Sequence, residues 1–161
     1  MVRPIVEEVA QHDISSTVAV AGNPIHAMLV HFPIALTVIV LGCDVLYWFD
    51  ADTFWARAAL WASGGAFWAG VIASIAGLAE LLLVTGIRVR AASWSHAVVA
   101  VMLLSVLGAN WGARQWGDET NLLPAGLFLS LLGMLNVAFA GWHGGKLVFD
   151  HGIGLMVSSK D

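Results

Sequence analysis

The most informative pattern in this sequence is the length of its apolar runs. A helix needs about 20 mostly apolar residues to cross the hydrocarbon core of a bilayer. Four stretches meet this requirement, at approximately residues 28–49, 54–84, 92–111 and 122–142. The sequence therefore predicts an all-α membrane protein, in which four transmembrane helices form an up-down-up-down bundle.

Two features inside these runs predict local breaks in the helices. Pro33 removes the hydrogen bond to the Leu29 carbonyl, so we expect a bend in the first helix beside His31. Gly144 and Gly145 predict the end of the fourth helix. The bundle domain is predicted to extend over residues 23–154, between an N-terminal tail of residues 1–22 and a C-terminal tail of residues 155–161.

Small residues recur at four-residue spacing along the second span, which predicts close contact with neighbouring helices. Glu80 continues one of these rows and should therefore face the bundle interior. The rows are Ala62, Ala66 and Gly70, and Ala69, Ala73 and Gly77.

Composition and charge agree with a membrane location. The chain is 59% hydrophobic and 11% charged, with a mean hydropathy of +0.82, and the lipid bilayer is its predicted partner. No basic patch suggests nucleic acid. An excess of Lys and Arg marks the cytoplasmic face of a membrane protein. The face that holds both termini carries five such residues, which predicts cytoplasmic termini: Arg3, Arg88, Arg90, Lys146 and Lys160, against Arg57 and Arg114 on the other face.

Histidines gather at one predicted end of the bundle. The up-down order brings together the starts of the first and third helices and the ends of the second and fourth. Ionisable groups in a membrane are costly, and they usually pair or mark a binding site, a proton path or an ion path. Asp44 lies toward the opposite face, where we expect a structural role. The histidine-rich end carries His26, His31, Glu80, His96, His143 and His151.

Two sequence motifs resemble a known family. Residues 22–33 read Gly-Asn-Pro-Ile-His-Ala-Met-Leu-Val-His-Phe-Pro, and residues 141–152 read Gly-Trp-His-Gly-Gly-Lys-Leu-Val-Phe-Asp-His-Gly. They resemble the bacterial membrane family called domain of unknown function 2231, from Gly22 to about Gly154. The resemblance implies four transmembrane helices in the bacterial inner membrane, and no particular activity. Ala27 stands where the family pattern often has proline, whereas these positions match it: His26, His31, Gly144, Gly145 and His151.

The chemistry must therefore come from the residues themselves. A b-type haem in a helical bundle is commonly held by two imidazoles from different helices, with small residues making room for it. We interpret the histidine cluster as a haem b site for electron transfer. The favoured deep pair is His31 with His96 or His143, and His26 with His151 could form a shallower site. The chain has no Cys-x-x-Cys-His motif, which excludes covalent c-type attachment.

Other interpretations stay open. Four side chains, His31, His96, His143 and Glu80, make a mixed nitrogen and oxygen set that suits a transition metal such as iron, zinc or copper. His31, Glu80 and His96 could instead form a proton or small-solute path. A third alternative is a noncatalytic subunit whose small-residue faces assemble with a redox partner or a second copy. Structural hydrogen bonding alone would also account for the histidines. The sequence assigns no catalytic residue.

Overall fold

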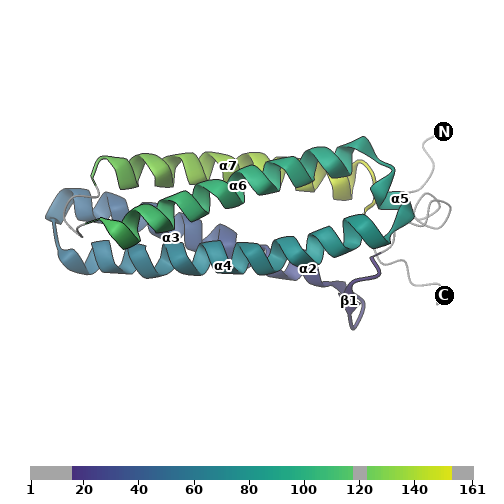
Figure 1. Cartoon of the computed structure of the whole chain (residues 1–161), viewed down its shortest axis with the longest axis horizontal. Helices are drawn as coiled ribbons and strands as arrows, with labels where there is room; N and C mark the ends of the chain where they lie inside the picture. Colours follow the sequence, from purple (N-terminus) through teal and green to yellow (C-terminus); the bar gives the residue numbers. More distant parts are fainter. Residues whose placement is uncertain (1–15, 118–122, 154–161) are drawn as a thin grey trace.

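Four long helices lie side by side and form an elongated bundle (Figure 1). The structure, a computed structural model, describes residues 16–117 and 123–153. Four helical segments are long and apolar enough to cross a membrane, which confirms the predicted all-α membrane fold. The elements are β1 (Ala19–Val20), β2 (Asn23–Pro24), α2 (Ile25–Leu29), α3 (His31–Asp50), α4 (Thr53–Leu83), α5 (Thr85–Arg88), α6 (Ala91–Trp116) and α7 (Ala125–Phe149).

The predicted and observed spans differ most at the ends of α6 and α7, which both extend further. The prediction that Gly144 and Gly145 end the last helix is wrong, because α7 continues to Phe149. A Cβ at Gly144 would lie 3.2 Å from Cε1 of His96 on α6. Gly144 therefore lets the His96 ring approach the α7 backbone closely.

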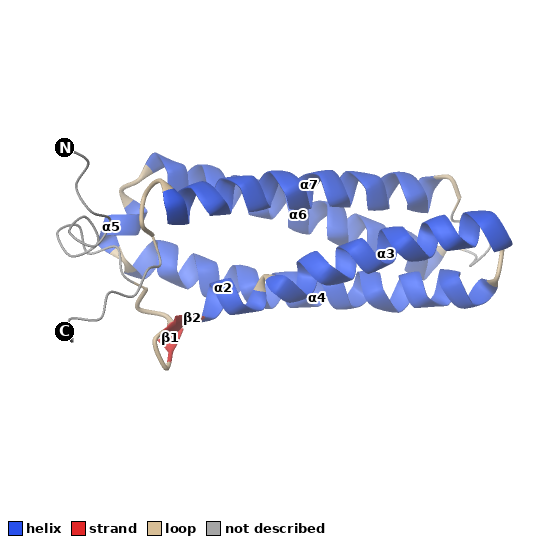
Figure 2. Ribbon diagram, turned by 180° about the vertical axis from the view of Figure 1, so that it is seen from behind, coloured by secondary structure: helices blue, strands red, loops and turns tan. Residues whose placement is uncertain are grey.

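The first membrane-crossing segment is interrupted beside Pro33, as predicted. It divides into α2 and α3 at Val30 (Figure 2). Pro33 is buried against α4, where a Cβ at Gly70 would lie 3.8 Å from the Pro33 Cβ. Thr37 donates a 2.7 Å hydrogen bond to the Pro33 carbonyl. The interruption changes the direction of the chain between His26 and His31.

Residues 16–24 precede α2 and contain a short β-hairpin. β1 and β2 pair in antiparallel fashion, and Ala21 and Gly22 in the turn have φ of 50° and 78°. Such positive values suit a tight hairpin turn. Figure 2 shows this hairpin at the same end of the bundle as α5. The predicted C-terminal tail, most of the predicted N-terminal tail and His12 lie outside the described residues.

Small residues line the interior of the bundle, and large apolar residues cover its outside. Each long helix packs against two others: α3 and α6 both contact α4 and α7. Ala66 is fully buried, and a Cβ at Gly70 would come within 3.2 Å of Leu104 Cδ1. The predicted close contact along α4 is therefore confirmed inside the bundle. Large side chains that face outward, toward the lipid, include Ile72, Ile75, Val98, Val101, Phe128 and Leu135.

Candidate functional site: a histidine layer and a buried ion pair

Three imidazoles from α2, α6 and α7 gather at one end of the bundle; we call His26, His96 and His143 the histidine layer. The rings of His26 and His96 lie edge to face, with centroids 6.3 Å apart and planes at 82°. His26 also packs against α4, where its Nδ1 lies 2.8 Å from the Ala73 carbonyl oxygen. The predicted meeting of these helix ends is therefore present in the structure.

His96 occupies the centre of the histidine layer. On one side its ring faces His26, and on the other it packs against Gly144 of α7, the residue that follows His143. Its Nδ1 atom is buried and has no hydrogen-bond partner among the described residues, and the same holds for Ser93 Oγ, one turn earlier on α6. Burying an unpaired polar atom costs about 1–3 kcal/mol, so two such atoms on one turn call for an explanation.

Backbone carbonyls orient the imidazoles of three histidines. The Nδ1 atom of His143 lies 3.0 Å from the Phe139 carbonyl oxygen, and that of His31 lies 3.2 Å from the Met28 carbonyl oxygen. A carbonyl oxygen can only accept, so in these residues, as in His26, we infer that Nδ1 carries the proton. In a neutral ring Nε2 then holds the free lone pair. Metal-ligating histidines commonly have this arrangement.

His31 does not join the histidine layer as the sequence-based pairing expected. Its side chain is exposed, and its ring bonds to its own helical turn. His26, five positions earlier, takes its place beside His96 because α2 and α3 are separate segments. The sequence had paired His26 with His151 as a shallower site, because His26 lies nearer the start of the first helix than His31.

The predicted metal set of His31, His96, His143 and Glu80 is not assembled. Glu80 is buried, as expected, but it accepts a hydrogen bond from Ser16, ahead of the hairpin. Across residues 16–117 and 123–153, no three His, Cys, Asp or Glu side chains converge in the way a metal ion requires. Helix depth alone does not specify which way each side chain points, so residues at one level need not converge.

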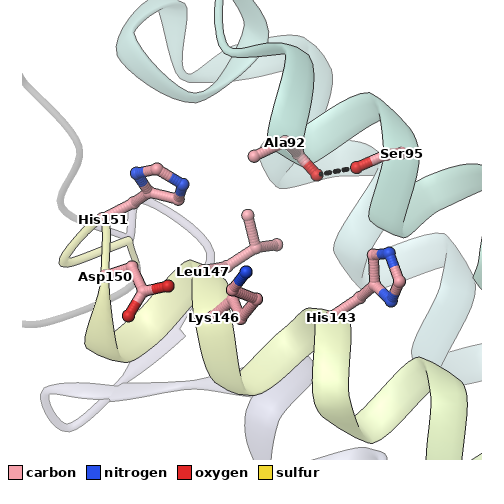
Figure 3. Close-up of a pocket in the computed structure, with 7 residues that line it drawn as sticks. All are labelled: Ala92, Ser95, His143, Lys146, Leu147, Asp150 and His151. Carbon is pink, nitrogen blue, oxygen red and sulfur yellow. Dashed lines mark hydrogen bonds between the residues drawn. The ribbon is translucent and has the colours of Figure 1, made fainter.

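A cleft of about 360 Å³ opens between the start of α6 and the end of α7. Figure 3 shows the rings of His143 and His151 on either side of Leu147. His143 belongs both to the histidine layer and to this cleft, whereas His151 lines the cleft only. The lining residues are Ala92, Ser95, His143, Lys146, Leu147, Asp150 and His151.

The opposite end of the bundle holds a buried ion pair. Nη1 and Nη2 of Arg114 donate to the two carboxylate oxygens of Asp44, at 2.8 and 2.6 Å. Only 3% of Arg114 and 5% of Asp44 is exposed. Ser130 on α7 donates to the same carboxylate at 2.5 Å, and Asn110 accepts from Arg114 Nε at 2.9 Å. One network therefore joins α3, α6 and α7.

Sequence reasoning missed this network. Asp44 was expected to have a structural role, which agrees with its buried ion pair. Arg114, however, was counted as a surface cation on the face away from the termini, and no partner was predicted for it. The available signal was the regular position of Ser130 on the small, polar stripe of α7, which indicated a polar interior at that level. Depth also agreed, since Asp44 and Arg114 both lie near helix ends on the face away from the histidines.

Replacing Gly77 by alanine tests how tightly His26 is packed. A Cβ at Gly77 would lie 2.8 Å from His26 Nδ1, so the ring must move away from Ala73. We expect Gly77→Ala to lower stability by about 1–3 kcal/mol, the usual cost of overpacking. Gly42→Ala is the control, because nothing lies within 4 Å of its Cβ position. Thermal unfolding in detergent measures both, and equal Tm values would contradict the packing.

The comparison with known families agrees with this fold. A family model described as a predicted membrane protein, DUF2231, matches residues 22–156. No curated protein and no solved structure matches the chain. The match covers all four long helices, the histidine layer and the buried ion pair. The chain therefore belongs to the DUF2231 family of predicted membrane proteins.

Proposed function

We propose that this protein transfers electrons in the bacterial inner membrane and holds a b-type haem between the imidazoles of His26 and His96. One observation carries the proposal: two imidazoles from different helices lie edge to face inside an apolar bundle, with centroids 6.3 Å apart. His26 is oriented by the Ala73 carbonyl, and Nδ1 of His96 is buried without a partner among the described residues. The orientation of His26 is the one expected of a metal-ligating histidine, and the buried, unpaired Nδ1 of His96 leaves that ring without a competing partner.

The separation of the two rings fits a single metal between them. Imidazole nitrogens bind transition metals at about 2.0–2.1 Å, which places the centroids of two opposed rings about 6 Å apart. The observed separation of 6.3 Å agrees with this value. Because the rings lie edge to face, at least one must turn before both nitrogens face the same iron.

The surrounding chain supplies orientation and an apolar environment. Gly77 and Gly144 present bare backbone to the rings of His26 and His96. A haem bound there supplies a centre that accepts and releases one electron. The contribution of this chain is to hold the two imidazoles, and the Ala73 carbonyl keeps the Nε2 lone pair of His26 available.

The interior favours a bound cofactor over a proton path across the membrane. Glu80, one member of the alternative path, is already bonded to Ser16. Between His96 and Asn110, about 21 Å along α6 at about 1.5 Å per residue, the buried side chains Val99 and Leu107 are apolar. Along α6, apolar side chains therefore separate the two polar ends of the bundle.

The histidine layer is proposed to face the cytoplasm. Arg88, Arg90 and Lys146 lie at this end of the bundle, whereas Arg57 lies at the other end. Arg114 is buried in its ion pair and does not act as a loop charge. Leaving Arg114 out of the count therefore strengthens the bias of cations toward the histidine end.

The optical spectrum of the protein purified from haem-supplemented cells tests this function. We expect Soret and α bands in the reduced-minus-oxidised difference spectrum, with one haem for each chain. Elemental analysis of the same sample identifies any other bound metal. A haem-supplemented sample without these bands would contradict the proposal, and stoichiometric zinc or copper would favour the transition-metal alternative.

A further inference from the structure

We propose that the cleft between α6 and α7 binds the hydroxyl-bearing headgroup of a membrane quinol. The proposal deepens the proposed function and rests on it for its purpose, since a quinol is a lipid-soluble source of electrons. Its evidence is independent of the haem, because it comes from the residues that line the cleft. No residue of the cleft is needed to orient His26.

The cleft is next to the histidine layer and close to the lipid. His143 lines it, and the following residue, Gly144, packs against the ring of His96. Phe139 and Trp142 on the same part of α7 are exposed on the outside of the bundle. The cleft volume of about 360 Å³ lies within the range of small-ligand sites. In this proposal a ring dissolved in the bilayer enters the cleft from this side of α7.

His143 determines which hydrogen bonds the cleft offers. Its Nδ1 donates to the Phe139 carbonyl, so in the neutral ring Nε2 is an acceptor. A ligand that meets this nitrogen must bring a donor, such as a hydroxyl group. Lys146 is a pure donor and binds a ligand oxygen. Ala92 and Leu147 supply apolar surface between these polar groups (Figure 3).

A quinol headgroup matches this set better than an anionic lipid headgroup. It carries hydroxyl groups on an apolar ring, so it can donate to His143 and accept from Lys146. A phosphate group has only acceptor oxygens when ionised, and it would meet the Asp150 carboxylate and the lone pair of a neutral His143. Lys146 is the one lysine or arginine among the described residues that line the cleft.

Binding of decylubiquinol to the full chain in phosphatidylcholine nanodiscs tests the cleft. Calorimetric titration, corrected with empty nanodiscs, gives the affinity. We expect His143→Leu and Lys146→Leu each to weaken binding about tenfold, the upper range for one lost hydrogen bond. Arg88→Leu is the matched control, because this exposed cation lies at the same end but outside the cleft. The dimethyl ether of the quinol, which lacks donors, should also bind about tenfold more weakly.

Several outcomes would overturn the proposal. They are equal affinity for quinol and dimethyl ether, unchanged binding in both cleft variants, and an equal loss in Arg88→Leu. Binding of phosphatidylglycerol in the same titration, together with no binding of quinol, would assign the cleft to a lipid phosphate instead. Because the titration does not use the haem spectrum, quinol binding by a protein without haem would contradict only the proposed function. Haem without quinol binding would contradict only the cleft.

Discussion

Replacing Arg114 by leucine should destabilise the bundle by about 3–5 kcal/mol, because the Asp44 carboxylate then stays buried without its charged partner. The side chain of Arg114 also satisfies Asn110 and Ser130, so the substitution disrupts a network that spans three helices. Equilibrium unfolding in mixed micelles measures the loss. This is the largest effect on stability that we expect from a single substitution in the described chain.

The double variant Asp44→Leu/Arg114→Leu distinguishes the effect of the buried charges on stability from the effect of side-chain packing. Removing both charges eliminates the uncompensated buried carboxylate, so stability should recover most of the way to wild type. Arg57→Leu is the control, since this exposed arginine lies at the same end of the bundle. A double variant as unstable as Arg114→Leu would show that the charges contribute little and that side-chain shape dominates.

Replacing His96 by alanine should weaken haem binding by at least about 100-fold, because changes to the partners of ligands alone cost about 10–100-fold. His26→Ala should have a similar effect, whereas His31→Ala should leave the affinity nearly unchanged. The reason is geometric: the rings of His26 and His96 lie next to each other, edge to face, and His31 is exposed. Titration of each purified variant with haem, followed at the Soret band, measures the three affinities.

Control measurements keep this result informative. His96 is central to the layer, so its loss could unfold the protein rather than remove a ligand. Far-UV circular dichroism and gel filtration of each variant distinguish these cases, and His96→Gln preserves much of the volume. A folded His96→Ala variant with wild-type affinity, or equal losses in His31→Ala and His26→Ala, would contradict the assignment of the ligands.

The membrane spans were predictable because the length of an apolar run directly reflects bilayer thickness. The interruption beside Pro33 was also predictable from the local sequence, because proline lacks the N–H group that would bond to a carbonyl of the preceding turn. The role of Gly144 was predicted wrongly because a glycine can either end a helix or allow a neighbouring side chain to approach the backbone. Only the position of His96 on another helix reveals which use applies here.

The members of the candidate site were less predictable than the end of the bundle where they meet. Depth along a helix follows from residue number, so His26, His96 and His143 could be placed at one level. The direction of each side chain depends on the rotation of its helix and, for His26, on the break at Val30. The bond between Asp44 and Arg114 joins residues far apart in the sequence, and neither residue has a local signature.

The central claim is that His26 and His96 together bind one haem iron, and electron paramagnetic resonance of the oxidised protein tests it most directly. Two imidazole ligands should produce a low-spin ferric signal in the wild-type protein and in His31→Ala. The signal should be lost or become high-spin in both His26→Ala and His96→Ala. A low-spin signal that survives in either of those two variants, or the absence of any ferric haem signal from the wild-type protein, would contradict the claim.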